Sequence, residues 1–398
     1  MRLICPMKIN YPFSIHICMY QHFYHVIHRS SSGVPDIIVC YVFQVSFQVM
    51  LSTLRTRFCG CRVILRKYSD QTAFPWERSK LPELLVSASS QFQSKEYAII
   101  DDVLDIDDAR CIREEIKRLK ASSRLEPNCT FIWDPTTQKT VLFPKSQILE
   151  YDYLSESKVK GAAETGQHTP LVDSLSKDTL FCRMLNAIWG RQVLVSNSDD
   201  LNINGDENIL VKQDLKLQCN KGNGGAFPIH FDSDPSVDTR FLTCILYLND
   251  QDDIDGGELV LYPHNADIVK IKPLLNRMVM FKSQSMAHRV LPSFSERYCL
   301  TLWCSTLPHS LHQGDVNNAR YLLERYQAAS NNEERQDIKK DILSLPHIRR
   351  HFLKYLHRDG WRRSIQESHD NTVENSKLLE LFDLEIQTIE NALGPMLR

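Results

Sequence analysis

Short runs of apolar and alternating residues, separated by turn residues, fill the middle of the chain and predict β-strands. The turns are marked by glycine-rich or acidic stretches such as KGNGG at 221–225 and DGG at 255–257. The run FLTCILYL at 241–248 is almost entirely apolar, which is typical of a strand covered on both faces. The expected strands are 215–220, 227–232, 241–248, 258–262, 277–282 and 297–303. Strands recurring in this way predict a double-stranded β-helix, the cupin-like jelly roll.

Helical periodicity flanks this β-rich core on both sides. A short strand at 97–100 precedes an amphipathic helix at 109–119, in which Ala109, Ile112, Ile116 and Leu119 mark the apolar stripe. Residues 122–170 are polar, with several prolines, and predict a loop or a hairpin near the entrance of the site. Further helices are expected at 175–189, 318–329, 333–343, 347–357 and 375–393. The fold class is therefore α+β, a jelly roll braced by helices and followed by a C-terminal helical extension.

These patterns divide the chain into an N-terminal extension at 1–80, a catalytic-type domain at 81–306 and a helical region at 307–398. The longest uninterrupted apolar run before residue 50, at 37–43, is far too short to span a bilayer. From Met50 onwards basic and apolar residues interleave without an acid until Asp70. This composition is typical of a mitochondrial transit peptide starting at Met50, with residues 1–49 an extension of the gene model. A basic tail on a cytoplasmic protein is the alternative.

Overall composition narrows the function only slightly. A formal net charge of -2 argues against a protein that binds nucleic acid over its whole surface. The 12 cysteines include no Cys-x2-Cys pair, so no zinc site is visible in local spacing. Cys244, Cys299 and Cys304 fall on predicted core strands and are expected to be buried thiols, which suits a reducing compartment or a mitochondrial matrix. The sequence leaves the oligomeric state open.

The most specific chemistry lies in His230, Asp232, His288 and Arg297. On a strand His230 and Asp232 point to the same side, because side chains alternate between faces. Two histidines and one carboxylate are the facial triad that holds non-haem Fe(II) with open coordination positions. Arg297 offers a planar fork that suits a buried carboxylate. Arg297, Thr301 and Trp303 share one face of their strand. In the strand at 241–248, Thr243, Ile245 and Tyr247 share one face, so Tyr247 can reach the same lumen.

Each of these residues also has a structural interpretation. His230 could be a buried histidine that is merely satisfied by hydrogen bonds, Arg297 could pair with the neighbouring Glu296, and Tyr247 could be a core aromatic. A second His-x-Asp, at His357 and Asp359, follows residues with helical spacing and is expected to end a solvated basic helix without binding metal.

The remaining motifs favour structural roles. The glycine-rich 221–225 segment is a strand-to-strand turn, since no phosphate-binding Lys-Ser/Thr follows it. His347 and His351 have helical metal spacing but no carboxylate partner, so a solvated helix face is expected. The basic run at 349–363 could contact nucleic acid or an acidic partner, although a solvated amphipathic face is the commoner explanation.

Four sequence blocks carry a family resemblance: GNGGAFPIHFDSD, TCILYLND, DGGELVLYP and AHRVLPSFSERYCLTLW. Together they make residues 216–305 similar to the catalytic core of 2-oxoglutarate- and Fe(II)-dependent prolyl 4-hydroxylases, closest in pattern to the hypoxia-sensing enzymes. The resemblance implies His230, Asp232 and His288 as iron ligands. It further implies that Arg297 binds the C5 carboxylate of 2-oxoglutarate, with Tyr247 and Thr301 as hydrogen-bond partners.

The resemblance also implies a reaction and its cofactors. The expected function is hydroxylation of a prolyl residue in a protein or peptide, with Fe(II), 2-oxoglutarate, O2 and L-ascorbate. Asn220 stands where similar enzymes have tyrosine, and Ile229 where they have arginine; these departures affect the rim of the pocket and hence the substrate. The same chemistry on a small molecule or another side chain, or a non-catalytic jelly-roll interaction module, are the alternatives.

Overall fold

The computed structural model describes residues 15–20, 23–28, 75–78, 80–134, 136–153, 169–189, 209–234, 238–264, 266–306 and 313–397. The chain divides into two units, residues 1–69 and 70–398. In the first unit, β1 (Ile15–Tyr20) and β2 (Phe23–His28) form an antiparallel hairpin. The expected transit peptide begins at Met50, and residues 50–74 lie outside the described part of the chain. Within the described part of the chain, no helix is both long and apolar enough to cross a membrane.

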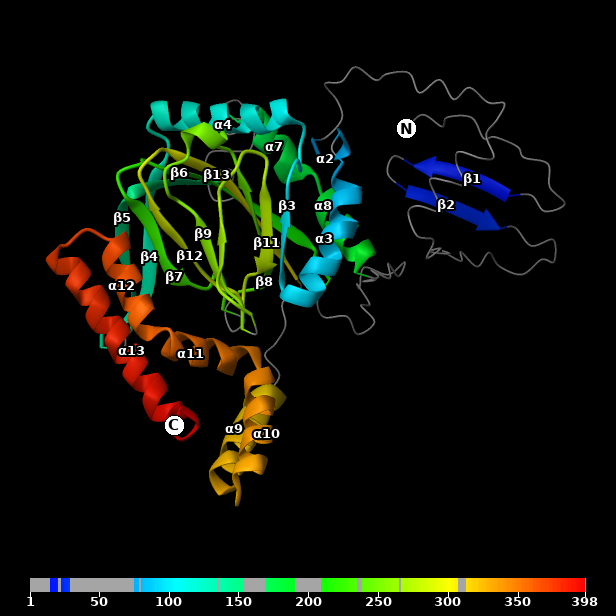
Figure 1. The fold of residues 1–398 in the computed structure, drawn as a ribbon. Helices are drawn as coiled ribbons and strands as arrows, with labels where there is room; N and C mark the ends of the chain where they lie inside the picture. The colour runs from blue at the N-terminus through cyan, green and yellow to red at the C-terminus, as the bar shows by residue number, and fades with distance from the viewer. Residues whose placement is uncertain are drawn as a thin grey trace. The chain divides into compact units, whose positions relative to one another are not determined.

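Two facing antiparallel sheets form the core of the second unit, as a double-stranded β-helix (Figure 1). The larger sheet has the strand order β3-β11-β8-β13-β6-β5-β4 and the smaller one β10-β9-β12-β7. The larger sheet contains β3 (Tyr97–Ile100), β4 (Glu126–Asp134), β5 (Lys139–Asp152), β6 (Lys212–Asn220), β8 (Arg240–Tyr247), β11 (Met278–Lys282) and β13 (Arg297–Ser305). The smaller sheet contains β7 (Gly225–His230), β9 (Leu259–Tyr262), β10 (Val269–Ile271) and β12 (Ala287–Ser293). The expected jelly roll is confirmed.

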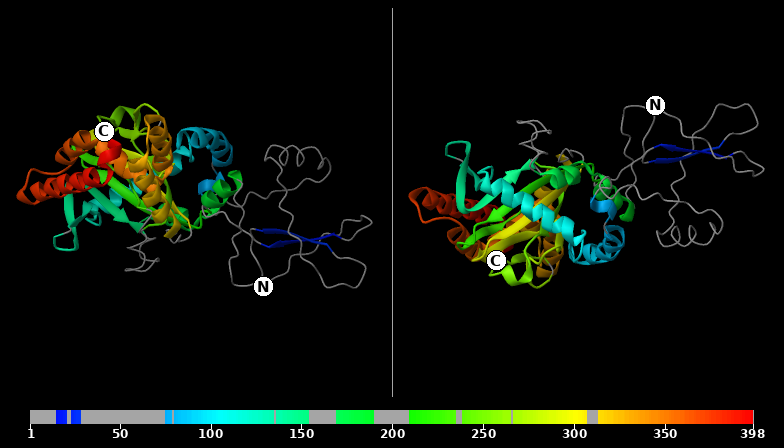
Figure 2. Two further views of the ribbon diagram at one scale, coloured as in Figure 1. Left: turned by 90° about the horizontal axis from the view of Figure 1, so that it is seen from below. Right: turned by 90° about the horizontal axis from the view of Figure 1, so that it is seen from above.

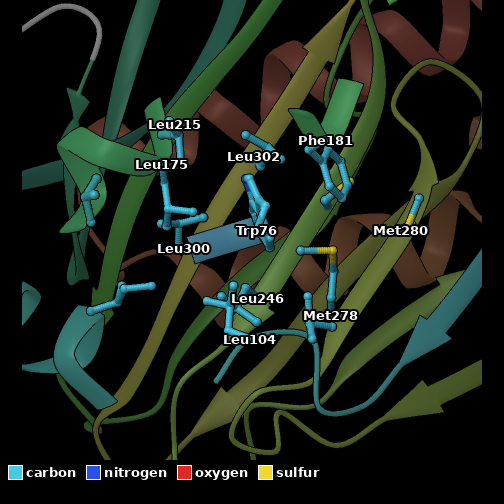
Figure 3. Packing of buried hydrophobic residues seen from close by; sticks show 14 of the residues in the cluster. Trp76, Leu104, Leu175, Phe181, Leu215, Leu246, Met278, Met280, Leu300 and Leu302 are labelled. Atoms are coloured by element: carbon cyan, nitrogen blue, oxygen red, sulfur yellow. The ribbon is translucent and has the colours of Figure 1, made fainter. Parts of the chain in front are cut away.

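Helices cover the outer face of the larger sheet, and a large apolar core lies between them. Alternation along β13 sends Leu300 and Leu302 into this core, whereas Thr301 faces the lumen between the sheets. Trp76 is buried in the same core, with its ring centroid 5.3 Å from that of Phe181 (Figure 3). The helices on this side are α2 (Pro75–Arg78), α3 (Leu81–Lys95), α4 (Ile106–Ala121), α7 (Pro170–Lys177) and α8 (Leu180–Ile188). Helix α4 buries the expected stripe of Ala109, Ile112, Ile116 and Leu119.

The C-terminal helices lie on another side of the β core (Figure 2). They are α9 (Gln313–Ala328), α10 (Asn332–Ser344), α11 (Pro346–Leu356), α12 (Arg358–Ser368) and α13 (Val373–Leu397). Helix α12 packs on β7 and β12, and an apolar cluster that includes Ile229, Ala287, Trp361 and Phe382 joins α12 and α13 to the strands. Helices α9 and α10 share a smaller apolar cluster of their own.

Several elements differ from the sequence-based expectation. The polar stretch 122–170 contains a long hairpin, β4 and β5, which extends the larger sheet from β6 and confirms the hairpin alternative. The single helix expected at 175–189 is two helices, because the backbone of Asp178, at the end of α7, is extended and α8 begins again at Leu180. Helices α3 and α12 and the strands β10 and β12 were not expected.

Candidate metal and co-substrate site

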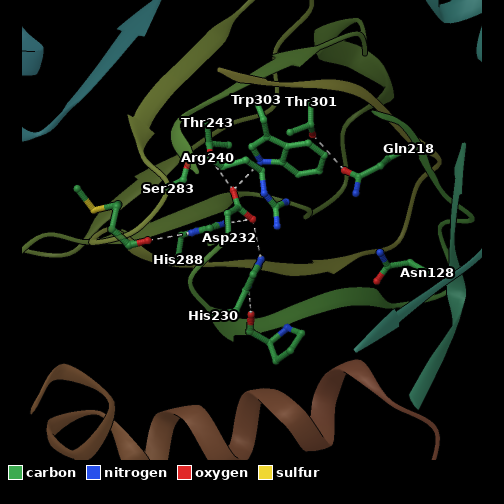
Figure 4. A network of polar contacts seen from close by, with 12 residues as sticks. Asn128, Gln218, His230, Asp232, Arg240, Thr243, Ser283, His288, Thr301 and Trp303 are labelled. Atoms are coloured by element: carbon green, nitrogen blue, oxygen red, sulfur yellow. Dashed lines mark hydrogen bonds and ion pairs between the residues drawn. The ribbon is translucent and has the colours of Figure 1, made fainter. Parts of the chain in front are cut away.

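Two strands of the smaller sheet and the loop after β7 bring His230, Asp232 and His288 together. His230 ends β7 and lies directly opposite His288 of β12, so their ring centroids are 4.2 Å apart. Asp232 follows two residues after His230, just beyond the strand, and its Oδ1 lies 3.5 Å from His230 Nε2 and 3.7 Å from His288 Nε2. All three ligand atoms are within 4.8 Å of one another, which is close enough to share one metal ion (Figure 4).

Backbone carbonyls orient both imidazole rings in the same way. The Nδ1 of His230 donates to the Pro228 carbonyl at 2.8 Å, and the Nδ1 of His288 donates to the Met286 carbonyl at 3.1 Å. A carbonyl oxygen can only accept, so the proton resides on Nδ1 in both rings. In the neutral form of this tautomer the lone pair is on Nε2, which points toward Asp232 in both rings, as a metal ligand requires.

The Asp232 carboxylate is oriented from the opposite wall of the lumen. Its Oδ2 accepts from Thr243 Oγ1 at 2.7 Å and from Trp303 Nε1 at 3.3 Å, while Thr243 also bonds Ser283 at 2.8 Å. These partners hold Oδ2 and leave Oδ1 facing the two histidines. Sequence reasoning placed Thr243 and Trp303 on lumen-facing positions of their strands but did not assign them to Asp232. The strand alternation was the signal that could have found them.

Burial and the neighbouring side chains set the charges of these groups. Burial, reinforced by nearby His230, lowers the pKa of His288 to about 4, so its ring is neutral near pH 7. Burial alone would raise the pKa of Asp232, but the two histidines and the Thr243 hydroxyl outweigh it and hold that pKa far below its usual value. A carboxylate and neutral imidazoles are the donors that a divalent iron accepts. The residues present thus fit the metal.

Arg297 is a buried cation in the same lumen without a carboxylate partner. It is 4% exposed, and its guanidinium lies over the Tyr247 ring, 4.9 Å from the centroid. Its Nη1 donates to the Cys299 sulfur at 3.5 Å. Among the described residues, its Nε has no hydrogen-bond acceptor and no carboxylate lies within ion-pair distance of the guanidinium. Glu296 binds Lys120 and the Tyr298 hydroxyl, so the alternative Arg297–Glu296 pair is wrong.

Tyr247 and Thr301 lie near Arg297 but differ in exposure to the lumen. Tyr247 is fully buried beneath the guanidinium, and its hydroxyl has no hydrogen-bond partner among the described residues. Thr301 lines the lumen, where its hydroxyl is 3.5 Å from the Gln218 side-chain oxygen (Figure 4). An incoming carboxylate would give the guanidinium an acceptor that the chain itself does not provide.

These residues line a cavity of about 800 Å³ that is open on one side. Its walls come from both sheets, from the β4–β5 hairpin and from α11, α12 and α13. His230, Asp232, His288, Arg297 and Thr301 all line it. The helix contribution was not expected: Arg350 of α11 donates to the Ser233 carbonyl at 2.6 Å and lies 4.8 Å from the Phe231 ring centroid. The basic run is therefore not a wholly solvated face.

The two departures noted in the sequence have structural consequences. The Asn220 amide closes the turn after β6, since its Nδ2 donates to the Gly225 carbonyl at 2.6 Å and its Oδ1 accepts from the Gly222 amide at 3.0 Å. Gly222 has φ +82°, a conformation that favours glycine. Ile229 packs in the apolar cluster with α12 and α13.

The second His-x-Asp motif does not form a metal site. His357 lies between α11 and α12, with its ring centroid 5.3 Å from that of Tyr262, and Asp359 is in the first turn of α12. In the described ranges, His230, Asp232 and His288 form the one cluster of potential metal ligands.

Comparisons with known proteins agree with this geometry. Residues 215–305 match the family model of the 2OG-Fe(II) oxygenase superfamily. A prolyl 4-hydroxylase from Phytophthora capsici is similar in structure, with a TM-score of 0.53, 25% identity, and coverage of 84% of this chain and 95% of that one. A Trichoplax adhaerens prolyl hydroxylase was solved with a peptide fragment of the hypoxia inducible factor oxygen degradation domain. It gives a TM-score of 0.42 at 21% identity, with coverage of 60% of this chain and 96% of that one. A search of curated protein sequences gave no match.

Proposed function

On the premise that this chain belongs to the 2OG-Fe(II) oxygenase superfamily, whose core is residues 215–305, we propose that it is a prolyl 4-hydroxylase acting on a protein or peptide. In this proposal His230, Asp232 and His288 hold Fe(II), and Arg297 holds the C5 carboxylate of 2-oxoglutarate. Ascorbate would keep the metal reduced. With 2-oxoglutarate and O2, the bound iron would supply oxidative decarboxylation to succinate and CO2, coupled to hydroxylation of a substrate C–H.

One observation carries the catalytic part of the proposal. An oriented His-Asp-His cluster and a buried arginine line the same cavity, and the described residues give that arginine no counterion. A structural histidine cluster would need no unpaired guanidinium, and a buried cation is costly unless something pairs with it. A dicarboxylic keto acid would bind the metal through its keto and adjacent carboxylate groups and would give Arg297 a partner through its second carboxylate.

The side chains of this chain have separate tasks in that reaction. Arg297 can grip a carboxylate through two parallel N–H bonds, which fixes the position of the co-substrate as well as its charge. Thr243 and Trp303 hold one oxygen of Asp232, so the other oxygen stays available to the metal. Arg297 and Asp232 are mostly buried in the wall of the cavity, where the low local dielectric strengthens these polar contacts.

The prolyl substrate is supported by the similarity to the Phytophthora capsici prolyl 4-hydroxylase, which extends over 84% of this chain. The β4–β5 hairpin and the C-terminal helices both contribute to the wall of the cavity, whose volume of about 800 Å³ can admit part of a polypeptide segment. The same cavity could admit a small molecule, and this second substrate class is decided by the experiment that follows.

Succinate formation by the purified protein with Fe(II), 2-oxoglutarate, O2 and ascorbate tests the proposal. We expect turnover that rises when proline-containing peptides are added, with a mass increase of one oxygen on the peptide. Matched peptides in which alanine replaces proline are the control. Turnover without peptide stimulation would favour another substrate, and absence of Fe(II) binding would favour a non-catalytic module.

We also propose that the protein works in mitochondria, on the basis of the acid-free basic stretch that begins at Met50. A fluorescent reporter fused to residues 50–80 should enter the organelle, and changing Arg55, Arg57, Arg62 and Arg66 to Gln should prevent import. Diffuse cytosolic fluorescence from fusions that begin at either Met1 or Met50 would overturn this location.

A further inference from the structure

Lys145 of β5 is a second buried cation in the wall of the cavity. Only 4% of the residue is exposed, and it lies among the residues that line the lumen. Its Nζ donates to Asn128 Oδ1 at 2.6 Å and lies 5.3 Å from the centroid of the Phe227 ring. An ammonium group has three donors, so an amide oxygen and a ring face leave it incompletely satisfied.

The charged side chains around Lys145 do not neutralise it. Glu150 is the carboxylate nearest to this network, but its Oε1 pairs with Lys216 Nζ at 3.1 Å and its Oε2 accepts from the Asn128 amide. Asn128 thus separates Lys145 from Glu150, with its oxygen toward the lysine and its nitrogen toward the carboxylate. Among the described residues, no carboxylate lies within ion-pair distance of Lys145 Nζ. The described residues therefore give the protonated form of Lys145 no ion-pair partner, and burial disfavours that form unless an anion binds beside it.

Electrostatics agree with a cation that lacks its partner. The pKa of Lys145 is lowered to about 7, mainly by burial and to a smaller extent by nearby Lys216. Glu150 and Cys129 oppose this shift only in part. His369, beyond α12, also feels the lysine charge. An anion entering the cavity would favour the ammonium form and raise that pKa.

We infer that Lys145, positioned by Asn128, forms a carboxylate-binding subsite in the cavity, separate from the one at Arg297. The two cations come from strands that β6 separates, and each has its own neighbours, since Lys145 bonds Asn128 and the Arg297 guanidinium lies over Tyr247. The carboxylate comes either from the substrate or from the metal-proximal end of the keto acid. The subsite refines the proposed function by giving a ligand class, and it can be measured without turnover.

Calorimetric titration of the Mn(II)-loaded full chain, without oxygen, tests the subsite. The protein is first titrated with 2-oxoglutarate and then, at saturation, with succinate as a carboxylate probe. For a substrate subsite we expect succinate to bind wild type beside 2-oxoglutarate, and Lys145→Met to weaken succinate binding by tenfold to a hundredfold. The 2-oxoglutarate affinity should change less than about twofold. Lys282→Met, which removes a lysine paired with Glu96 instead, should bind both ligands as wild type does.

The two titrations distinguish a carboxylate of the substrate from the metal-proximal carboxylate of the keto acid. If no second succinate site exists but Lys145→Met weakens 2-oxoglutarate tenfold or more, the subsite serves the keto acid. If Lys145→Met binds both ligands as tightly as wild type, the inference is overturned. Lys145→Gln is the second variant, should the methionine variant fail to fold, and near-ultraviolet circular dichroism checks both. Failure of hydroxylation in a separate assay would leave these binding results unchanged.

Proton uptake gives an independent readout. At pH 7.5 the lysine is largely neutral in the empty cavity, because its pKa is about 7. Carboxylate binding should draw a proton onto Lys145, and the apparent enthalpy should vary with the ionisation enthalpy of the buffer. We expect this dependence to disappear in Lys145→Met. Its persistence, unchanged, in that variant would overturn the assignment to Lys145.

Discussion

The indole of Trp303 donates to the Asp232 carboxylate at 3.3 Å, across the lumen from the larger sheet to the loop after β7. The hydroxyl of Thr243, on the neighbouring strand β8, donates to the same oxygen. The proposed metal ligand is thus held in place by two strands that contribute no ligand themselves. Iron affinity should therefore depend on residues outside the His-Asp-His set.

Removing a ligand should abolish activity without unfolding the protein. We expect His230→Ala or Asp232→Ala to lose 2-oxoglutarate turnover, since the ligands line a cavity rather than fill the apolar core. Fe(II) binding and succinate release measure the effect, and far-ultraviolet circular dichroism monitors the fold. Near-normal decarboxylation in Asp232→Ala would contradict the ligand assignment.

Weakening the support of Asp232 should have a smaller, graded effect. Trp303→Phe and Thr243→Val each remove one hydrogen bond to Oδ2, so each should lower Fe(II) affinity by about tenfold to a hundredfold. Thr388→Val, on an exposed part of α13, is the matched control. Metal affinity in both lumen variants equal to that of wild type would show that the carboxylate needs no such support.

Replacing Arg297 tests the co-substrate site. Arg297→Lys keeps the charge but loses the planar fork, so the apparent affinity for 2-oxoglutarate should fall by about tenfold to a hundredfold. Arg277→Lys, which alters an ion pair with Asp101 and is not part of the cavity lining, should leave that affinity unchanged. An unaltered affinity in Arg297→Lys would mean that another residue holds the keto acid.

Acid should loosen the attachment of the C-terminal helices through His369. This ring accepts from the Thr130 hydroxyl of β4 at 3.0 Å and donates to the Ile365 carbonyl at 3.1 Å, and burial lowers its pKa to about 4. The unfolded chain, with an ordinary histidine pKa near 6.5, binds more protons between these values. The free energy of unfolding should therefore rise with pH from about 4 to about 6.5, by up to about 3 kcal/mol from this residue.

Chemical denaturation at several pH values measures this dependence. His369→Gln should reduce the rise within that window by up to about 3 kcal/mol, because glutamine does not titrate, while the buried His288 still contributes in both proteins. Parallel curves for the variant and the wild type would contradict the role assigned to His369.

The β core could be predicted because its physical signals are local. The apolar run that became β8 and the turns at 221–225 and 255–257 are properties of adjacent residues. The meeting of His230, Asp232 and His288 was predicted from the family resemblance. The expected strand 227–232 was too long, because β7 ends at His230 and Asp232 lies in the following loop, where strand alternation does not apply. Trp303 and Thr243 were placed on the correct faces, yet their bonds to Asp232 depend on a loop whose path no local pattern specifies.

Helix α12 and the Lys145 subsite were missed for different reasons. Helix α12 was missed because its two buried apolar positions, Trp361 and Ile365, stand among the charged residues Arg358, Arg362 and Arg363. Gly360 is also a residue typical of a helix end. Lys145 lies in a polar stretch with several prolines, so its burial depends on β7, α12 and the hairpin packing together. Tertiary contacts of this kind leave no periodic trace in the sequence.

The contact between α12 and β7 bears on the association of this protein with itself. β7 ends the order of the smaller sheet, and the amide of Ile229 donates to the Ser364 hydroxyl at 2.9 Å rather than to another strand. An exposed edge strand can pair with a strand from another molecule and start aggregation. Helix α12 shields this edge with its own side chains, so a chain shortened after β13 should tend to self-assemble through β7 even where its jelly roll still folds.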